Sequence, residues 1–304
     1  MSDWTRVEKL FGSENLALLA QKRVGVVGVG SGGGFVALSL AMSGVGHFVL
    51  VDNDVLEEGN VVRHVADRRY LGQNKAAAVA DLIQQRNPQA QVTVVEGPIE
   101  DHADALDGLD LLIVGVDHEN TKYWLNQQCL DRRLIALYAG VYERGEGGDV
   151  VLIYPYDGPC YACWAAELRG SSPVSARGDG EELDYGMIGE SGTLDAEPGL
   201  WLHVVKVAAI QTDLALNELL RGTDVHEPMP ANTLVIANNA IEIVDGEVSQ
   251  PHTGLWVQIE RDPQCLVCGD KVRLTDEIPM VRSLADLGVD FSDDEAQQAQ
   301  DEQA

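Results

Sequence analysis

The sequence predicts an α/β protein in which a doubly wound, mostly parallel sheet is continued by antiparallel strands. Three observations lead to this fold class. Short apolar runs alternate with longer helical segments over the first 140 residues, which is typical of parallel β-α-β units. A glycine-rich turn follows the first apolar run, where Rossmann-like folds pass from strand to helix. After Gly140 the alternation ends, and the last strand-like runs are spaced like an antiparallel meander.

Each element of the first half follows from its own pattern. Residues 1–22 are predicted to form a helical lead-in, and residues 24–29 a strand whose unbroken apolar run is typical of burial on both faces. A helix follows the glycine turn and ends near Gly44 and Gly46, because glycine favours helix C-termini. The remaining predicted strands are 47–52, 91–95, 110–114 and 134–139, and the remaining helices are 73–86 and 119–132.

The second half has fewer regular features. A long helix is predicted at 201–220, and strands are predicted at 150–154, 234–237, 241–244 and 255–259. Residues 170–199 are rich in Gly, Ser and acidic side chains, and we expect a mobile crossover loop there. The predicted parts are a lead-in (1–22), a Rossmann-like part (23–140), an antiparallel continuation (141–280) and a disordered acidic tail (281–304).

The composition is strongly acidic. The 49 Asp and Glu against 21 Lys and Arg give a formal net charge of −28. Such a surface repels nucleic acid and anionic lipid, whereas a basic protein remains a suitable partner. A salt-adapted or solubility-tuned surface has the same composition. No apolar run approaches the roughly 20 residues of a membrane span, and residues 1–4 do not resemble a signal peptide, so we expect a cytoplasmic protein.

The glycine-rich turn predicts a nucleotide site. Gly28, Gly30 and Gly33 form a G-x-G-x-x-G frame, which lets backbone N–H groups approach phosphates at a helix N-terminus. Asp52 ends the second predicted strand, where a carboxylate can accept hydrogen bonds from both ribose hydroxyls or can cap the strand end. The turn alone indicates a nucleotide and does not say which one.

The polar residues that follow Asp52 favour a triphosphate. The forked guanidinium of Arg63 can bind two phosphate oxygens, and Lys75 can neutralise a leaving pyrophosphate. Asn60 can donate a hydrogen bond to a phosphate oxygen. Asp117 follows the fourth predicted strand, and its carboxylate there suits Mg²⁺. Taken singly, these residues are also ordinary surface charges and a turn residue.

The order of these residues resembles the E1-like adenylating superfamily, which includes the ThiF, MoeB and HesA proteins and the ubiquitin-activating enzymes. The resemblance implies that Asp52 holds ribose, that the triphosphate is bound and activated by Asn60, Arg63 and Lys75, and that Asp117 binds a catalytic Mg²⁺. The implied reaction is attack of a carboxylate on the α-phosphorus of ATP, giving an acyl adenylate and pyrophosphate. The resemblance covers most of residues 1–280 and rests on the string Gly28-x-Gly30-x2-Gly33 … Asp52-x-Asp54-x5-Asn60-x2-Arg63 … Gly72-x2-Lys75 … Asp117.

The resemblance also implies a homodimer in which an N-terminal Arg reaches into the partner's active site. Arg6 is the candidate for this role. Lys9, ahead of Leu10-Phe11-Gly12, is the alternative, and both residues also fit an ordinary charged helix face.

Two cysteine pairs predict a structural zinc site. Cys160-x2-Cys163 and Cys265-x2-Cys268 supply four thiolates, and a closed set of four thiolates is typical of structural Zn²⁺. Disulfides and free thiols are the alternatives, of which a reducing cytoplasm disfavours the first. The ThiF- and MoeB-type members carry their cysteine pairs at corresponding places. We therefore expect zinc to staple the fold and to take no part in the chemistry.

The catalytic cysteine of thioester-forming members has no counterpart in the predicted crossover loop. Residues 186–199 contain Ser191 and Thr193 but no cysteine. The fifth cysteine, Cys129, falls among apolar residues of a predicted helix, which indicates a buried small side chain. The sequence therefore favours a reaction that stops at the acyl adenylate or passes it directly to an outside nucleophile.

The leading hypothesis is ATP-dependent adenylation of the C-terminal carboxylate of a ubiquitin-like or sulfur-carrier protein ending in Gly-Gly, without a thioester. One alternative keeps the site and changes the acceptor to a peptide, a small molecule or a tRNA-base carboxylate. The charge of −28 disfavours tRNA. Two hypotheses from different classes are an NAD(P)-binding oxidoreductase, which has no use for Arg63, Lys75 and Asp117, and a nucleotide-binding scaffold without turnover.

Overall fold

The computed structural model describes residues 3–170, 187–188, 194–195, 199–244 and 247–273 of the 304-residue chain. Contacts divide the chain into two compact units, Met1–Arg261 and Asp262–Ala304. The first unit holds the main sheet and most of the candidate site residues. In the second unit, the described part contains the second cysteine pair and the short helix α8 (Asp270–Arg273). The predicted acidic tail, 281–304, lies outside the described residues.

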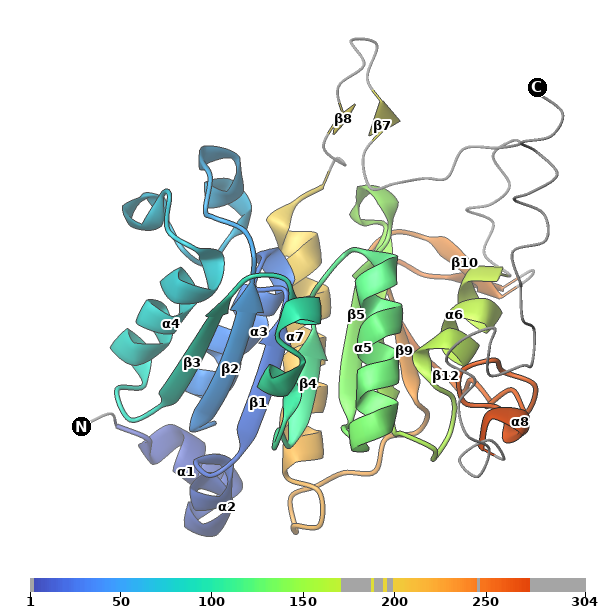
Figure 1. Cartoon of the computed structure of the whole chain (residues 1–304), viewed down its shortest axis with the longest axis horizontal. Helices are drawn as coiled ribbons and strands as arrows, with labels where there is room; N and C mark the ends of the chain where they lie inside the picture. The colour runs from blue at the N-terminus through green and yellow to red at the C-terminus, as the bar shows by residue number, and fades with distance from the viewer. Residues whose placement is uncertain (1–2, 171–186, 189–193, 196–198, 245–246, 274–304) are drawn as a thin grey trace, which may run out of the picture. The chain divides into compact units, whose positions relative to one another are not determined.

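The central feature is an eight-stranded sheet with the order β12-β9-β6-β5-β4-β1-β2-β3 (Figure 1). Strands β1 to β5 are parallel to their neighbours within that set, which confirms the doubly wound fold. The order reverses at β1, where β2 lies on one side and β4 on the other. The parallel strands are β1 (Arg23–Val27), β2 (His47–Asp52), β3 (Gln91–Glu96), β4 (Leu111–Val114) and β5 (Ala136–Val141).

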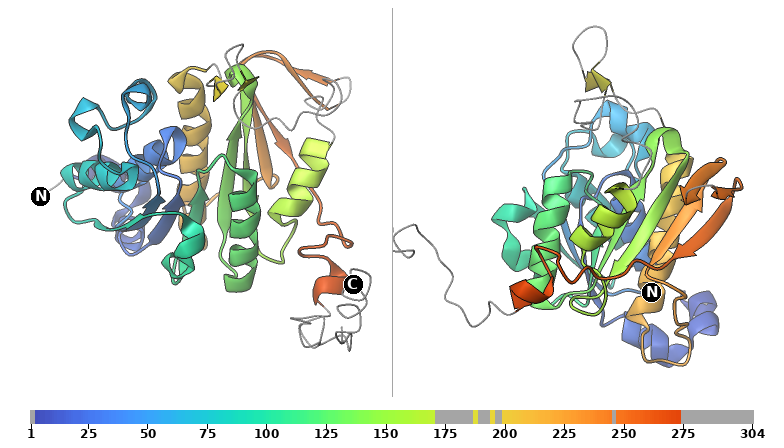
Figure 2. Two further views of the ribbon diagram at one scale, coloured as in Figure 1. Left: turned by 45° about the horizontal axis from the view of Figure 1, so that its top comes forward. Right: turned by 90° about the vertical axis from the view of Figure 1, so that its right-hand side faces the viewer.

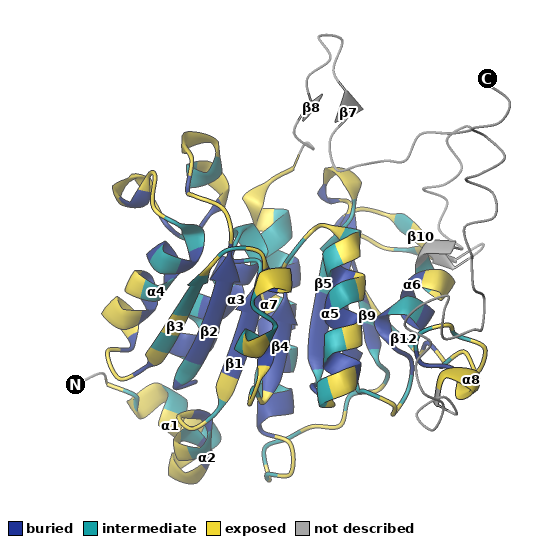
Figure 3. Cartoon of the chain, viewed as in Figure 1, coloured by how far each residue is buried: buried dark blue, intermediate teal, exposed yellow. Residues whose placement is uncertain are grey.

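Helices cover both faces of the parallel strands (Figure 2). One buried cluster joins β1 and β2 to α3, α4 and α7, and a second joins the opposite face to α5 and α6. Strands β1, β2 and β4 are buried almost throughout, as expected of strands covered on both faces (Figure 3). The helices are α3 (Ser31–Met42), α4 (Lys75–Arg86), α5 (Glu119–Arg132), α6 (Tyr161–Gly170) and α7 (Trp201–Leu219).

The antiparallel continuation is confirmed, but the predicted meander is wrong. Strands β6 (Gly147–Ile153), β9 (Thr233–Ala237) and β12 (Thr253–Val257) extend the sheet. Strand β10 (Ile241–Val244) pairs instead with β11 (Glu247–Ser249) in a separate hairpin. The regular ladder stops after β9, because the N–H groups of Asn238 and Asn239 both donate to the carbonyl of Glu146. A further two-stranded hairpin joins β7 (Met187–Ile188) and β8 (Leu194–Asp195).

Element boundaries differ from prediction where glycine has a packing role. β6 begins at Gly147, three residues before the predicted strand, because Gly147 and Gly148 look like turn residues in the sequence. In the fold they are strand residues packed too tightly for a side chain. A Cβ on Gly147 would lie 2.5 Å from the Ile236 carbonyl oxygen, and one on Gly148 the same distance from that of Gly140.

The remaining segments are short. The lead-in is two helices, α1 (Thr5–Phe11) and α2 (Ser13–Leu19), which meet at Gly12 with a φ of 82°. Short 3₁₀ segments connect the rest: η1 (Glu58–Arg63), η2 (Arg68–Tyr70), η3 (Ile99–Asp101), η4 (Ala103–Leu106) and η5 (Glu143–Gly145). Of the helices in the described part of the chain, not one combines the length and the apolar character needed to cross a bilayer.

Candidate functional site

The predicted nucleotide residues gather at the carboxyl ends of β1, β2 and β4. The glycines of the turn after β1 have different tasks there. Gly28 has a φ of +83°, and a Cβ on it would lie 2.6 Å from the backbone of Gly115 after β4. A Cβ on Gly33 would lie 1.9 Å from the Gly28 carbonyl oxygen. Around Gly30, by contrast, a Cβ would meet no atom within 4 Å. Gly28 and Gly33 are therefore required by packing, whereas Gly30 borders open space at the start of α3.

Asp52, the last residue of β2, is tied to the glycine turn. Its Oδ2 accepts the N–H of Val29 at 2.6 Å, and its Oδ1 accepts the N–H of Asp54 at 2.9 Å. Burial raises the pKa of this carboxyl, and the two backbone N–H groups oppose the rise. Asp52 therefore caps the end of β2, which is the alternative role that the sequence allows for this residue. Each carboxylate oxygen still has a lone pair for a hydroxyl group, so ribose binding by Asp52 stays a prediction.

Lys75 lies at the first position of α4, facing the chain after β2. Its Nζ is 2.7 Å from Asp54 Oδ2, and its side chain is only 13% exposed. The Lys75 N–H also donates to the Asp54 carbonyl oxygen at 2.9 Å. These two contacts hold the Lys75 side chain in place, with its ammonium group beside the Asp54 carboxylate.

Asn74 is a positioning residue that the sequence reasoning missed. Its Oδ1 accepts the N–H groups of Ala76 and Ala77, which caps α4, and its Nδ2 donates to the Asp52 carbonyl oxygen at 2.9 Å. One side chain thus fastens the N-terminus of α4 to the end of β2. The available signal was an Asn just before a helical run, which is a preferred N-cap.

Arg63 and Asn60 both belong to the segment η1. Arg63 is exposed, and its NH1 group lies 3.2 Å from the Oγ of Ser31, the first residue of α3. A guanidinium beside the positive end of a helix dipole makes that place attractive to an anion. Asn60 acts in the capping box of η1, where its Oδ1 accepts the Glu57 N–H at 3.0 Å. Asn60 thus has the structural role in a turn that the sequence allows. Its Nδ2 group is not used in the capping box, so phosphate binding by Asn60 stays a prediction.

His64 follows Arg63 and was not singled out from the sequence. Its side chain is 6% exposed, with Nε2 2.8 Å from the Val29 carbonyl oxygen. Its Nδ1 accepts the Ala66 N–H at 3.0 Å. A lone His in a short polar segment carries no local signal for this role, because its partner in the turn lies 35 residues earlier.

Asp117 and the N-terminal cations lie on the surface. Asp117 comes three residues after β4 with its side chain 65% exposed, and its Oδ1 lies 3.9 Å from His118 Nε2. Within the described residues, no hydrogen bond or ion pair joins Asp117 to Arg63 or Lys75. Arg6 and Lys9 lie exposed on α1, a helix without buried residues. The Mg²⁺, dimer and cross-subunit roles of these residues stay predictions.

The two cysteine pairs each form a tight turn. Cys160 and Cys163 have their sulfur atoms 3.8 Å apart, and the Tyr161 N–H between them donates to Asn126 on α5. In the second pair, the Val267 N–H donates to the Cys265 sulfur. Each pair thus offers two thiolates to a metal ion, and the joint zinc site stays a prediction.

The fifth cysteine has the environment expected of a structural residue. Cys129 is 1% exposed on the inner side of α5, and burial raises its pKa to about 12. A thiol with so high a pKa is a poor nucleophile at neutral pH. The predicted crossover loop, with Ser191 and Thr193, lies outside the described residues apart from β7, β8 and Gly199.

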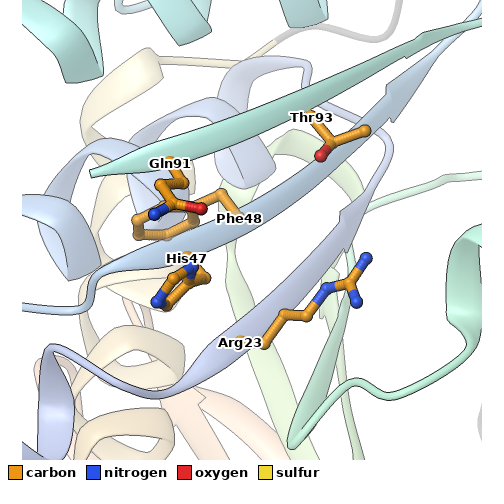
Figure 4. Close-up of a pocket in the computed structure, with 5 residues that line it drawn as sticks. All are labelled: Arg23, His47, Phe48, Gln91 and Thr93. Atoms are coloured by element: carbon orange, nitrogen blue, oxygen red, sulfur yellow. The ribbon is translucent and has the colours of Figure 1, made fainter.

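A pocket at the other end of the sheet is unrelated to these residues. Arg23, His47, Gln91 and Thr93 border a hollow of about 280 Å³ at the amino ends of β1, β2 and β3. In Figure 4 the Arg23 guanidinium extends away from the His47 ring, so the polar groups do not converge on one point. Strand β3, which borders the hollow, is the edge strand of the sheet and is only partly buried.

The fold and site define a Rossmann-like nucleotide-binding protein with cations gathered behind its glycine turn. The ThiF family model matches residues 5–251, and the chain belongs to that family. This confirms the resemblance drawn from Gly28, Asp52, Arg63 and Lys75.

Named relatives and solved structures agree with this membership. The chain is 28% identical over 270 residues to the adenylyltransferase and sulfurtransferase MOCS3 of Caenorhabditis briggsae, covering 87% of this chain and 59% of that protein. It is 26% identical to the molybdopterin-synthase adenylyltransferase of Salmonella typhimurium, over 85% of this chain and 92% of that one. Escherichia coli MccB with ATP shares the fold, with a TM-score of 0.64 at 21% identity over 87% of this chain and 74% of MccB.

Proposed function

We propose that this protein uses ATP to adenylate the C-terminal carboxylate of a ubiquitin-like or sulfur-carrier protein ending in Gly-Gly, without forming a thioester. The observation that carries the proposal is the arrangement around Gly30. This glycine borders open space at the N-terminus of α3, and the Arg63 guanidinium lies beside the next residue, Ser31. A guanidinium beside a helix N-terminus, in a chain of charge −28, favours an anionic ligand there.

The named activities of the relatives support the reaction class. The MOCS3 relative and the Salmonella relative are both adenylyltransferases, and the second of them serves a synthase. The chain spans 59% of the length of the MOCS3 relative, so we propose the adenylyltransferase activity alone and not the sulfurtransferase activity. The partner's Gly-Gly tail follows from the family resemblance.

The proposed reaction requires positioning and charge neutralisation more than a protein base. A carboxylate oxygen of the carrier attacks the α-phosphorus, the bond between the α-phosphorus and its bridging oxygen breaks, and the electron pair leaves on pyrophosphate. Arg63 and Lys75 would neutralise the leaving phosphates, and Asp52 would orient the ribose. A Mg²⁺ held by Asp117 would add further positive charge, and its exposed carboxylate suits an ion that keeps several waters.

Carrier-dependent ATP–pyrophosphate exchange tests the proposal. We expect exchange with an intact carrier, and none with the same carrier lacking its two terminal glycines. Exchange with a peptide or small carboxylate alone would move the acceptor to one of those classes. Protection from thermal unfolding by NADH but not by Mg-ATP would overturn adenylation altogether.

The burial of Cys129 predicts that the reaction proceeds without it. We expect Cys129→Ala to cost about 1–2 kcal/mol of stability, because a small buried group is removed. The rate of acyl-adenylate formation should stay within roughly twofold of wild type, since no transition-state contact is lost. Gel analysis with and without a reducing agent should show no thiol-sensitive adduct between enzyme and carrier. A sensitive adduct that disappears in Cys129→Ala would contradict the proposal.

We further propose that the four paired cysteines bind structural Zn²⁺, because two C-x2-C pairs supply the four thiolates of its preferred tetrahedral set. Cys163→Ser should remove most of the roughly one zinc ion per chain expected of such a site and lower Tm by roughly 5–10 °C. Metal analysis and thermal unfolding measure both effects. The control is Cys129→Ala, which should keep its zinc. Equal zinc content in wild type and Cys163→Ser would refute the assignment.

A further inference from the structure

His64 is held in one protonation state by its two hydrogen bonds. The Ala66 N–H can only donate, so His64 Nδ1, 3.0 Å away, must accept and carries no proton. The ring proton is therefore on Nε2, which donates to the Val29 carbonyl oxygen at 2.8 Å. The ring is neutral and buried, and both of its nitrogen atoms are occupied.

The Val29 residue that His64 binds is the first position between the motif glycines. Its N–H donates to Asp52 at 2.6 Å, so both of its backbone polar groups are held from outside the turn. In a planar trans peptide the C=O and the following N–H point in opposite directions. The Gly30 N–H therefore points away from His64. Among the described residues it has no hydrogen-bond acceptor, and space is open around Gly30.

A glycine outside the motif frame makes room for this contact. Gly34 does not belong to the G-x-G-x-x-G frame, yet a Cβ there would lie 3.2 Å from the Val29 carbonyl oxygen and 3.4 Å from His64 Nε2. A side chain at Gly34 would therefore press on the Val29 carbonyl oxygen and on Val65 Cγ2, 3.3 Å away, and would come into contact with the His64 ring. Gly34 thus leaves room for the chain segment that carries the hydrogen bond.

The same anchor places Arg63. His64 is the C-cap of η1, with extended backbone angles of −131° and 153°, and Arg63 is the residue before it. Fixing His64 against Val29 thus fixes the end of η1 against the start of α3, where Arg63 meets Ser31. One buried ring thus helps to fix both a backbone donor of the turn and a guanidinium at the start of α3.

We propose that neutral His64 is a positioning residue for the nucleotide phosphates: it holds the Val29 carbonyl so that the Gly30 N–H and Arg63 face the same anion. The inference rests on the proposed function, because it assumes that a nucleotide occupies this turn. His64 itself touches no phosphate and acts only through Val29 and Arg63.

The charges around His64 set the expected pH dependence. Burial is the main cause of its lowered pKa, and the neighbouring cations Lys75 and Arg63 lower it further, whereas the Val29 carbonyl and Asp52 raise it. The folded state thus prefers the neutral ring, and this preference is fully present above the ordinary value of 6.5. As the pH falls through the lowered pKa of the folded state, Nδ1 becomes protonated and can no longer accept the Ala66 N–H. Nucleotide affinity should then decrease.

Two substitutions separate the two hydrogen bonds. In His64→Asn, the side-chain oxygen can still accept the Ala66 N–H two residues on, but the side chain is too short to reach Val29. In His64→Gln, the amide nitrogen reaches about as far as Nε2 and can donate to Val29 without titrating. His64→Asn thus keeps the hydrogen bond to Ala66 and loses the one to Val29. His64→Gln keeps the hydrogen bond to Val29.

Calorimetric binding of a non-hydrolysable ATP analogue with Mg²⁺ tests the proposal without needing the carrier. At pH 7.5 we expect His64→Asn to bind roughly tenfold more weakly, and His64→Gln within about threefold of wild type. As the pH is lowered from 7.5 through the lowered pKa of His64, wild type should lose affinity, and His64→Gln should lose markedly less.

The outcomes distinguish the two proposals. Equal affinities for wild type and both variants, or equal losses in both variants with no change in pH profile, would overturn the role of His64. If wild type does not bind the analogue, the turn is not a nucleotide site, and both the proposed function and the role of His64 are wrong. If His64→Asn does not fold, the pH profiles of wild type and His64→Gln still decide, because a purely structural histidine would not give His64→Gln a flatter profile.

Discussion

Replacing Gly30 by alanine is expected to weaken Mg-ATP binding about 50-fold while leaving the fold as stable as wild type. A methyl group on Gly30 meets no protein atom within 4 Å, and φ there is −74°, so the folded chain tolerates it. The same methyl group would occupy the space that phosphates need beside the helix N-terminus. Overpacking a site by one methyl group costs about 1–3 kcal/mol, which corresponds to this loss of affinity.

Gly33→Ala is the matched control for Gly30→Ala. Its methyl group would lie 1.9 Å from the Gly28 carbonyl oxygen, so the backbone must move. We expect a loss of at least about 3 kcal/mol in the free energy of unfolding, together with loss of nucleotide binding. Urea unfolding and calorimetry measure the two quantities. Tight ATP binding by Gly30→Ala would show that phosphates do not approach this glycine.

Lys75→Met is expected to lower the rate of carrier-dependent ATP–pyrophosphate exchange by about 10²–10³-fold. The ammonium group is partly sheltered, with 13% of the side chain exposed, and it is held by Asp54 at 2.7 Å. A charge positioned in this way can act on the leaving pyrophosphate at little reorganisation cost. Methionine keeps the stem and removes only the charge. Asp54 is 58% exposed, so water can solvate its carboxylate after the substitution.

The matched control is Arg69→Met, on η2 in the same polar region of sequence. Arg69 is also bound to a carboxylate, Asp67, but its side chain is 67% exposed. Removing its charge should change the exchange rate by no more than about threefold, because exposed pairs contribute little. Equal losses in Lys75→Met and Arg69→Met would mean that both act through the general surface field, and the assigned role of Lys75 would be wrong.

Much of the fold was predictable because its signals are local. An unbroken apolar run marked β2 at its observed bounds, and the helical pattern did the same for α5. The glycine frame was recognisable because a tight turn and a close helix approach both need glycine at fixed offsets. Signals of this kind depend on a few neighbouring residues, so a sequence displays them directly.

Some features could not be predicted, because their causes lie far apart in the chain. The β10–β11 hairpin leaves the sheet where two N–H groups bind Glu146, more than 90 residues earlier. Gly147 looks like a turn residue until the Ile236 carbonyl is placed beside it.

The sequence by itself determined the nucleotide turn, the cations that follow it, the paired cysteines and the family to which the chain belongs. Tertiary structure decided which glycine borders open space and which ones pack against backbone. It also made His64, 35 residues from Val29, the clamp of the turn. The physical reason is that residue type sets what a group can do, whereas burial and the direction of its hydrogen bonds set what it does. Burial and hydrogen-bond direction are set only when distant segments of the chain pack together.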